Sequence, residues 1–593
     1  MASAHRTRRC LAACAASAVA SLWAASSAAA QTTVVTFPQP GAGSASPHSE
    51  ISFRGATAEE LRGVTVTGSR SGRHRGELRD HSDGRGVSFL PARRFAAGER
   101  VRVQVPPDLR IHGAFGRVAE FTVARVVGGF ATRGPSGAPS GHGRFPALRS
   151  RPDLAPPTVR PLVARPGRTP GYVFLAPKLG PGQGGPMIVD DSGRPVWFRP
   201  MPPGIRANDV RVQTYRGQPV ITWWEGRARG GSGRGVGVIL DQSYNVIKRV
   251  RAGNGLSADL HEFRLTDRGT ALLLAYVPVR RDLSEVGGPR AGIVVDGVAQ
   301  EIEIETGRVR WEWHSLDHVP LRDSNRPLPS SRNEPWDYFH PNSLNLDADG
   351  SYIISARSTS AVYSIGETGE VRWVLGGRSS TFRHGPGTRF ALQHDAIGHG
   401  DGVYTLFDNS ARGVRRASRG IAVRLDEQAR TATLLRTIRH PQSVLAATQA
   451  NMQLLPGGHV FVGWGSQGRI SEFDADGNLL LDLKLPVGFD TYRAYRFAWE
   501  GVPDRRPALA AAVGRSGRTT VYMSWNGSTE LHGWRVLAGD SPRSLQAVDW
   551  GDRKGLETQV TLQRRFRYVA AEAVDARGRT LARSATVRVP GRG

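Results

Sequence analysis

The chain has 593 residues, too many for one ordinary core, so two or three folding units are expected. It contains 71 glycines and 38 prolines, and short apolar runs bounded by Gly, Asp and Pro replace helix-period stripes, which predicts an all-β protein. The formal net charge of +27 comes from scattered arginines without a basic run or a binding motif, so we expect no nucleic-acid partner.

The first thirty residues are predicted to be an export signal. Basic residues up to Arg9 precede an apolar stretch at 11–25 and a small-residue cleavage site at 28–30. Cleavage near Ala30 would give a secreted or cell-envelope protein, and Arg8-Arg9 leaves the twin-arginine route open beside the general one. No later segment has the roughly 18 consecutive apolar residues of a membrane span, so none is expected.

Both cysteines, Cys10 and Cys14, lie inside this predicted signal. The mature chain would therefore contain no disulfide, no thiolate metal site and no cysteine nucleophile.

Short strand candidates separated by Gly, Ser and Asp turns fill residues 31–127, and they predict an immunoglobulin-like β-sandwich. Residues 128–170 are rich in Gly, Pro, Ser and Arg and are predicted to be a linker, because they offer little apolar surface to bury.

A repeat dominates residues 171–533. Hairpins such as Asp-Ser-Gly-Arg-Pro-Val-Trp at 191–197 and Glu-Thr-Gly-Arg-Val-Arg-Trp at 305–311, together with weaker copies, begin at 191, 241, 305, 367, 426 and 474. Their spacing suits one four-stranded blade per repeat, so a six-bladed β-propeller is predicted. Residues 534–593 continue as short strands, and the sequence leaves open whether they form a separate C-terminal β unit or help to complete the last blade.

A second repeated element places a polar residue ahead of each tight turn. Its copies begin near Asn208, His261, His340, His394 and Asn451. Within these copies, His261, Asn342 and His394 each precede their turn glycine by eight residues. If the strands superpose, these three side chains lie at one level of successive blades and surround the central axis.

Histidines gathered at such a hub allow three chemistries. Imidazole can act as a covalent nucleophile, as a general acid or base, or as a zinc ligand. A zinc site is disfavoured, because no His-x-His or His-x-x-x-His pair occurs at these positions and no carboxylate is evidently placed to complete one. A hydrated, purely structural channel stays open as an alternative.

Several motifs in this region resemble the arylsulfotransferase (ASST) family. They include Ala-Asp-Leu-His-Glu-Phe at 258–263, Tyr-Phe-His-Pro-Asn-Ser at 338–343, Phe-Ala-Leu-Gln-His-Asp at 390–395 and Trp-Gly-Ser-Gln at 464–467. The resemblance implies a six-bladed propeller behind an N-terminal β-sandwich. It also implies transfer of a sulfuryl group from a phenolic sulfate ester to another phenol through a sulfohistidine, without a nucleotide donor, cofactor or metal.

The resemblance also implies residue roles. His394 matches the nucleophile, and His261 and His340 would bind sulfuryl oxygens or serve the phenol oxygen as acid and base. Asn342 and Arg357 would bind the oxygens on which charge develops, and Asn451 is a further candidate contact with the substrate.

A non-catalytic binding module for a glycan, phenolic or protein ligand is the alternative, because a fold does not by itself establish a function. The sequence predicts neither the donor and acceptor nor the oligomeric state.

Overall fold

The computed structural model describes residues 31–128, 145–410 and 417–590. Within them the chain forms 43 strands, a single α-helix and four 3-10 helices, so the all-β prediction is confirmed. The helical elements are α1 (Ser315–His318), η1 (Ser284–Val286), η2 (Leu321–Asp323), η3 (Pro456–Gly458) and η4 (Gly465–Gln467). The export signal predicted for residues 1–30 and the linker segment 129–144 lie outside the described residues.

The N-terminal unit consists of two sheets that enclose one core. One sheet has the order β5 (Gly76–Asp80), β6 (Gly86–Pro91), β2 (Ile51–Arg54), β1 (Thr32–Phe37), β8 (Leu109–Ile111). The other has the order β4 (Gly72–His74), β3 (Thr65–Gly68), β7 (Arg100–Gln104), β9 (Val118–Thr122). Apolar side chains from both sheets, such as Phe53 and Phe121, meet in the core between them.

Six sheets follow, and each is built around four antiparallel strands. From the innermost strand outward they are β35 (Ala494–Phe497), β11 (Tyr172–Leu175), β12 (Met187–Val189), β13 (Pro195–Phe198); β14 (Arg206–Tyr215), β15 (Gln218–Arg229), β16 (Ser232–Leu240), β17 (Val246–Val250); β18 (Phe263–Leu265), β19 (Thr270–Arg281), β20 (Gly292–Glu303), β21 (Val309–His314); β22 (Pro341–Leu346), β23 (Tyr352–Ala356), β24 (Ala361–Ile365), β25 (Val371–Gly376); β27 (His394–Gly398), β28 (Val403–Asp408), β29 (Arg419–Asp426), β30 (Thr431–Ile438); and β31 (Asn451–Leu454), β32 (Val460–Gly463), β33 (Arg469–Phe473), β34 (Leu479–Lys484). The short β26 (Arg383–His384) pairs with β30 as a fifth strand.

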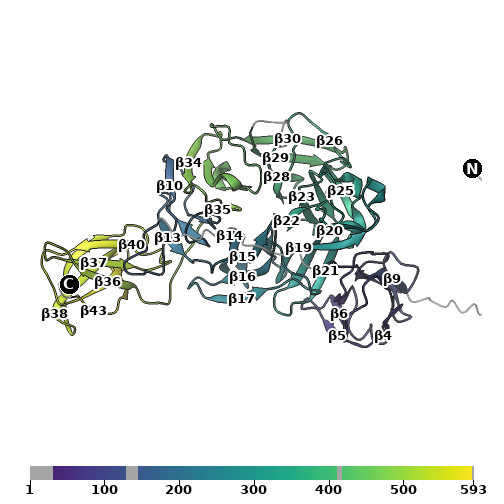
Figure 1. The fold of residues 1–593 in the computed structure, drawn as a ribbon, viewed down its shortest axis with the longest axis horizontal. Helices are drawn as coiled ribbons and strands as arrows, with labels where there is room; N and C mark the ends of the chain where they lie inside the picture. The colour runs from purple at the N-terminus through teal and green to yellow at the C-terminus, as the bar shows by residue number, and fades with distance from the viewer. Residues whose placement is uncertain (1–30, 129–144, 411–416, 591–593) are drawn as a thin grey trace, which may run out of the picture.

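The six sheets surround a common centre (Figure 1). Each innermost strand contacts the innermost strand of the next sheet or its neighbour, and β35 contacts both β14 and β32. Strand β35, from the end of this region, pairs with β11, from its beginning, so one sheet joins the two ends of the chain segment. The ring is therefore closed by main-chain hydrogen bonds.

The predicted Gly turns lie where the repeat placed them. Gly193, Gly307, Gly369 and Gly477 each have a positive φ and each connects the third strand of a sheet to the fourth. Glycine adopts this left-handed conformation without steric cost, which explains its recurrence in the hairpin motif.

Amide side chains link inner strands of neighbouring sheets. Asn451 Nδ2 donates to the Ala494 carbonyl (2.8 Å), while Asn451 Oδ1 accepts from the Ala494 N–H (3.0 Å). Gln453 makes the same pair of bonds with Arg496 in the next register position, at 2.9 and 2.8 Å. Asn345 reaches from β22 to β27 in a similar way. We call these side chains the amide clamps.

Two boundaries differ from those expected. The segment predicted as linker contains β10 (Arg160–Ala164), which pairs with β34 as a fifth, outer strand. The strands β36 (Ala508–Val513) and β37 (Thr519–Ser524), expected to lie in the repeat region, pair instead with β40 (Glu557–Thr561). The C-terminal unit therefore begins before Trp534, because its first two strands complete their sheet with a later one.

The second sheet of the C-terminal unit contains five strands. They are β39 (Ser544–Asp552), β38 (Gly533–Ser541), β41 (Tyr568–Val574), β42 (Thr580–Arg583) and β43 (Val587–Arg588). The two sheets share a core of their own, and the unit lies beside β13, while the N-terminal unit lies beside β21 (Figure 1). The question left open by the sequence is thus answered, because β35 and not the C-terminal unit supplies the closing strand.

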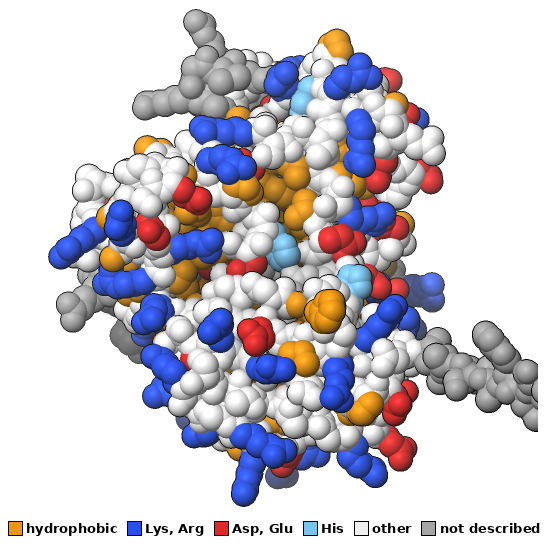
Figure 2. Space-filling model, turned by 90° about the vertical axis from the view of Figure 1, so that its right-hand side faces the viewer, with side chains coloured by type: hydrophobic (Ala, Val, Ile, Leu, Met, Phe, Trp, Pro, Cys, Tyr) orange, Lys and Arg blue, Asp and Glu red, His pale blue; other side chains and the backbone are white. Residues whose placement is uncertain are grey.

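The basic residues on the surface are dispersed. On the face drawn in Figure 2, Lys and Arg side chains are spread over the whole outline with Asp and Glu between them. Among the described residues, no helix has the length and apolar character needed to cross a membrane.

Candidate functional site

The candidate site lies where the innermost strands begin. Three of these strands open with a β-bulge, in β14, β22 and β27. Asp209 and Asp395 lie at the bulges of β14 and β27 and His340 directly precedes β22; their φ values are 63°, 55° and 56°. Such backbone conformations are unfavourable for non-glycine residues and concentrate at functional sites, because the surrounding structure must hold them in place.

The predicted histidines meet around two tyrosines, the half-buried Tyr276 and the buried Tyr492. The ring centroids of His261 and His340 are 4.9 Å apart, and Tyr276 stacks on His261 at 5.5 Å. Tyr492 lies 5.6 Å from His261 and 6.4 Å from His394, between the two imidazoles. The three histidines, which span 133 positions of the sequence, thus form one cluster with these two tyrosines, and we call it the histidine cluster.

His394 is held at both ring nitrogens. Asn409 Nδ2 donates to the carbonyls of Ala446 (2.8 Å) and Gln449 (2.9 Å), so Asn409 Oδ1 faces the imidazole and accepts the Nδ1 proton at 2.7 Å. This arrangement leaves the lone pair on Nε2, which accepts from the Gln449 N–H at 3.2 Å. Burial and the charge of Arg357 lower the pKa of His394 well below its usual value, which keeps the ring neutral.

His261 and His340 each rest on a carboxylate. His261 Nδ1 bonds to Asp259, and His340 Nδ1 bonds to Asp337 at 2.5 Å. Within the described residues, neither Nε2 has a hydrogen-bond partner. Burial lowers the pKa of His261 despite the opposing charge of Asp259. Each pair has the form of an imidazole oriented by an acid, with its outer nitrogen available for proton transfer.

These two carboxylates correct one expectation from the sequence, which found no acid evidently placed beside the histidines. Asp259 lies two residues before His261, and Asp337 lies three residues before His340. The chain is irregular just before each inner strand, and this brings the carboxylate close to the imidazole. The alternation of side chains along a regular strand does not predict such a contact. The signal was nevertheless present, since Asp259 stands inside the motif at 258–263.

Asn342 and Arg357 lie next to the cluster, and each has a side-chain atom without a hydrogen-bond partner among the described residues. Asn342 Nδ2 donates to the Gln393 carbonyl at 2.7 Å, but its buried Oδ1 has no hydrogen-bond partner among the described residues. The Arg357 main chain donates to the His340 carbonyl at 2.9 Å. Its guanidinium makes one long bond, at 3.4 Å to the Ala447 carbonyl, and its Nε makes none within the described residues.

Asn451 does not belong to the cluster. Both polar atoms of its side chain are used by the amide clamp on Ala494, and the residue is fully buried. The family resemblance implied a further polar contact with the substrate around Thr448 to Asn451, and Asn451 was the candidate for it. The structure gives Asn451 a bond to the next sheet at that position, and no free polar atom.

A buried ionic network, which sequence reasoning missed, closes the hub behind the histidines. Arg493 Nη1 lies 3.2 Å from both Asp209 Oδ1 and Glu262 Oε2, and Arg211 Nη2 lies 2.8 Å from Glu262 Oε1. Arg493 Nη2 also donates to the Asn342 carbonyl at 2.9 Å. Asp395, on the same side, lies 3.4 Å from Arg493 Nε. Removing one partner from such a network leaves an uncompensated buried charge, so its members depend on one another.

No group of three or more His, Cys, Asp or Glu side chains in the described parts of the chain has the geometry of a metal site. The Nδ1 atoms of all three histidines are engaged with Asp or Asn oxygens.

The site thus consists of three histidines, two of them bonded to carboxylates, at the centre of a closed ring of antiparallel sheets. Residues 211–485 match the family model described as Arylsulfotransferase (ASST), which confirms the family resemblance seen in the motifs. The matched segment contains the whole histidine cluster except Tyr492. No curated protein matches the sequence.

Solved structures give only distant likenesses. A protein of unknown function from Bacteroides caccae is 13% identical, with 55% of this chain and 98% of that chain covered and a TM-score of 0.34. A protein from Lactobacillus plantarum is 12% identical, with 66% and 99% covered and a TM-score of 0.29. Virginiamycin B lyase from Staphylococcus aureus, a catalytically inactive variant with quinupristin, is 10% identical, with 54% and 81% covered and a TM-score of 0.26. We infer nothing about function from these likenesses.

Proposed function

We propose that the protein is an exported aryl sulfotransferase that moves a sulfuryl group from a phenolic sulfate ester to a phenol. The neutral His394, with its Nδ1 proton held by Asn409 and its lone pair on Nε2, is the observation that carries the proposal. Its placement within the segment that matches the arylsulfotransferase family supports the same assignment.

In the first half-reaction, His394 Nε2 attacks the sulfur of the donor, and the bond between sulfur and the phenolic oxygen breaks. The leaving oxygen takes a proton from His261 or His340, whose Nδ1 atoms rest on Asp259 and Asp337. In the free protein the Gln449 N–H donates to the lone pair on His394 Nε2. Once that lone pair attacks sulfur, the N–H would be free to bind a sulfuryl oxygen.

In the second half-reaction, an acceptor phenol gives its proton to the same base and attacks the sulfur of sulfohistidine. The bond between Nε2 and sulfur breaks, and its electron pair returns to His394. Arg357, whose guanidinium has unused donors, would bind the oxygens on which negative charge develops.

The proposal extends to architecture and location. The six ring sheets would be the blades of a β-propeller, and the two-sheet N-terminal unit an immunoglobulin-like domain. The basic and apolar character of residues 1–30 supports export with cleavage near Ala30. The reaction needs no cofactor, because the nucleophile and the acid–base groups all come from the chain.

The test uses purified mature protein, a chromogenic aryl sulfate and a phenol acceptor. Without acceptor, at most one equivalent of chromophore per protein molecule is expected to be released. Release beyond one equivalent is expected only when the acceptor is present. Donor alone should add the mass of one sulfuryl group to the intact protein, and His394→Ala should abolish both effects without changing the melting temperature by more than a few degrees. Turnover that survives this substitution would sink the mechanism, and no turnover across a donor panel would favour a binding module.

A further inference from the structure

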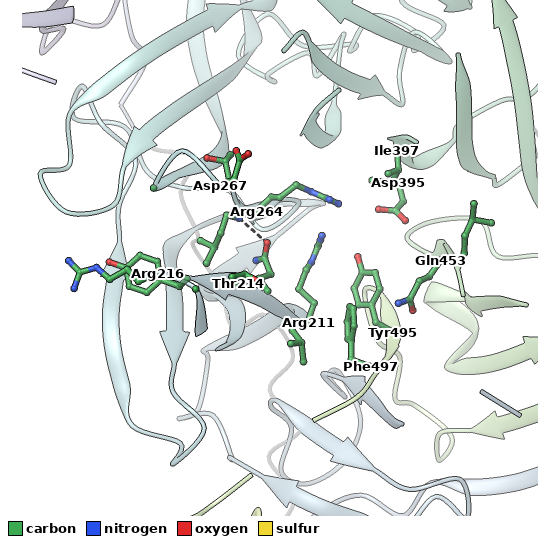
Figure 3. A pocket seen from close by; sticks show the side chains of 18 of the residues that line it. Arg211, Thr214, Arg216, Arg264, Asp267, Asp395, Ile397, Gln453, Tyr495 and Phe497 are labelled. Atoms are coloured by element: carbon green, nitrogen blue, oxygen red, sulfur yellow. Dashed lines mark hydrogen bonds between the residues drawn. The ribbon is translucent and has the colours of Figure 1, made fainter. Parts of the chain in front are cut away.

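The opposite end of the hub is hollow. The inner strands begin at the histidine cluster, and where five of them end they enclose a cavity of about 720 Å³ (Figure 3). This volume lies within the range of small-molecule sites, which is about 300–1,000 Å³. The cavity is lined by residues of β14, β18, β27, β31 and β35 together with the adjoining turns.

The cavity is separate from the histidine cluster. Arg493 and Glu262 are fully buried and lie between the two, with Arg493 bonded to Asn342 on the histidine side. Arg211 and Asp395, which are joined to the same ionic network, form the inner end of the cavity. A molecule in the cavity would therefore not touch the proposed nucleophile.

The walls of the cavity are largely apolar and aromatic. Leu265, Ile397, Tyr495 and Phe497 line it, and the Tyr495 and Phe497 rings lie 5.7 Å apart on one side. Such a wall suits the flat face of an aromatic ring, which buries a large area with little loss of conformational entropy.

Arg264 extends into this cavity toward Asp395 and Tyr495 (Figure 3). Its one ionic contact among the described residues is marginal, at 4.0 Å from Nε to Glu262 Oε1, and its Nε is buried without a hydrogen bond there. Arg211 Nε, at the inner end, is likewise buried without a hydrogen-bond partner in the described residues. An Arg fork without a partner is a ready donor for two oxygens of one anion.

The charges around Arg264 favour an anion. Burial raises the pKa of Asp395 despite the nearby Arg493, which moves this carboxyl toward its neutral form. Of the acids at the mouth, Glu305 is paired, since it is bonded to Arg216 at 2.7 Å. The arginines 211, 264 and 493 lie among the carboxylates of Asp209, Glu262 and Asp395, and Arg264 makes the longest of these contacts.

We propose that this cavity is a second binding site that takes a small aromatic carboxylate or sulfonate, with the ring on the Tyr495–Phe497 wall and the oxyanion on Arg264. The site does not depend on sulfuryl transfer at the histidine cluster. Its ligand could act from there on the histidines only through the ionic network that both share.

Isothermal titration of the full mature protein tests the site, with naphthalene-2-sulfonate and naphthalene-2-carboxylate as anionic probes and naphthalene-2-methanol as the neutral one. Both anions should bind more tightly than the alcohol. Arg264→Gln should weaken the anions by about tenfold or more, the loss expected for one charged hydrogen-bonded contact. Thr214→Trp, which fills the cavity from an exposed wall position, should abolish binding of all three probes.

Two further variants locate the site. Arg216→Gln is the matched control, because Arg216 lines the mouth with its charge already paired to Glu305, and it should leave the affinity within about twofold. His394→Ala should also retain the affinity, whereas loss in that variant would place the anion at the histidine cluster and overturn the proposal. Equal binding of the alcohol, unchanged affinity in Arg264→Gln with its melting temperature intact, or no binding at millimolar probe would overturn it as well.

Discussion

Asn409 Oδ1 accepts the Nδ1 proton of His394 at 2.7 Å, and the two amide protons of Asn409 are spent on the Ala446 and Gln449 carbonyls. The amide therefore cannot turn around, and the imidazole has a single tautomer with its lone pair on Nε2. An aspartate in the same place would fix the same tautomer but would also add a negative charge. Asparagine thus orients the ring while leaving it neutral.

Asn409→Ala should lower the rate of the first half-reaction by about 10- to 100-fold, the usual cost of losing a group that orients an imidazole. Without the acceptor at Nδ1, the ring is free to place its proton on Nε2, where it blocks attack on sulfur. Stopped-flow release of the phenol from a single turnover measures the rate directly. A rate equal to that of the natural protein would mean that Asn409 has no part in positioning His394.

Asn409→Asp should change the pH dependence of the same step. Burial and Arg357 hold the pKa of His394 well below its usual value, so this histidine should not lower the rate of the natural protein as the pH falls just below neutrality. A carboxylate at 409 favours the imidazolium and raises that pKa, so the variant should lose rate as the pH falls below neutrality. Identical profiles for the two proteins between about pH 5 and 8 would contradict the assignment of His394 as nucleophile.

The stability of the fold should also depend on pH through the buried histidines. The pKa values of His261 and His394 are lower in the folded chain than the unfolded value of about 6.5, so below that pH the unfolded chain binds more protons. The contribution of these two histidines to the free energy of unfolding is therefore fully present above about pH 6.5 and is lost as the pH falls below that value.

His394→Gln should flatten this dependence, because one of the histidines with a lowered pKa no longer titrates, while the others are present in both proteins. Melting temperatures between about pH 7.5 and 5 measure the effect in both proteins. His314 works in the opposite direction, since Asp296 and Glu312 outweigh burial and raise its pKa, but it is present in both proteins and cancels in the comparison. Parallel curves for the two proteins would show that the pKa of His394 is the same in the folded and the unfolded chain.

The sequence predicted the levels of the hub but not the polar contacts behind it. The repeat brought His261, Asn342 and His394 to one level because strand period and turn spacing carry that information. It could not assign Asp259 and Asp337, whose approach depends on bulges and left-handed residues ahead of the inner strands. Arg493 was missed for another reason, since it lies just before β35, the strand that closes the ring from the far end of the segment.

Two asparagines on inner strands, Asn342 on β22 and Asn451 on β31, should behave differently. Asn451 uses both polar atoms in its clamp on Ala494, whereas Asn342 uses one and leaves Oδ1 free beside the histidine cluster, as far as the described residues extend. Asn451→Ala would leave a buried N–H and a buried carbonyl unpaired, at a cost of about 1–3 kcal/mol in the free energy of unfolding. Its turnover rate, measured well below the melting temperature, should stay within about threefold of the natural value.

Asn342→Ala should show the reverse, with a fall in turnover of about tenfold or more and a smaller loss of stability, because it removes one hydrogen bond to Gln393 and a free acceptor at the site. Urea unfolding and steady-state kinetics on the same preparations compare the two variants. Gln453→Ala, which removes the neighbouring clamp on Arg496 outside the histidine cluster, should follow Asn451→Ala and serves as its control. If Asn451→Ala instead loses activity at full stability, the repeat position itself contacts substrate, and the distinction drawn from the amide clamps is wrong.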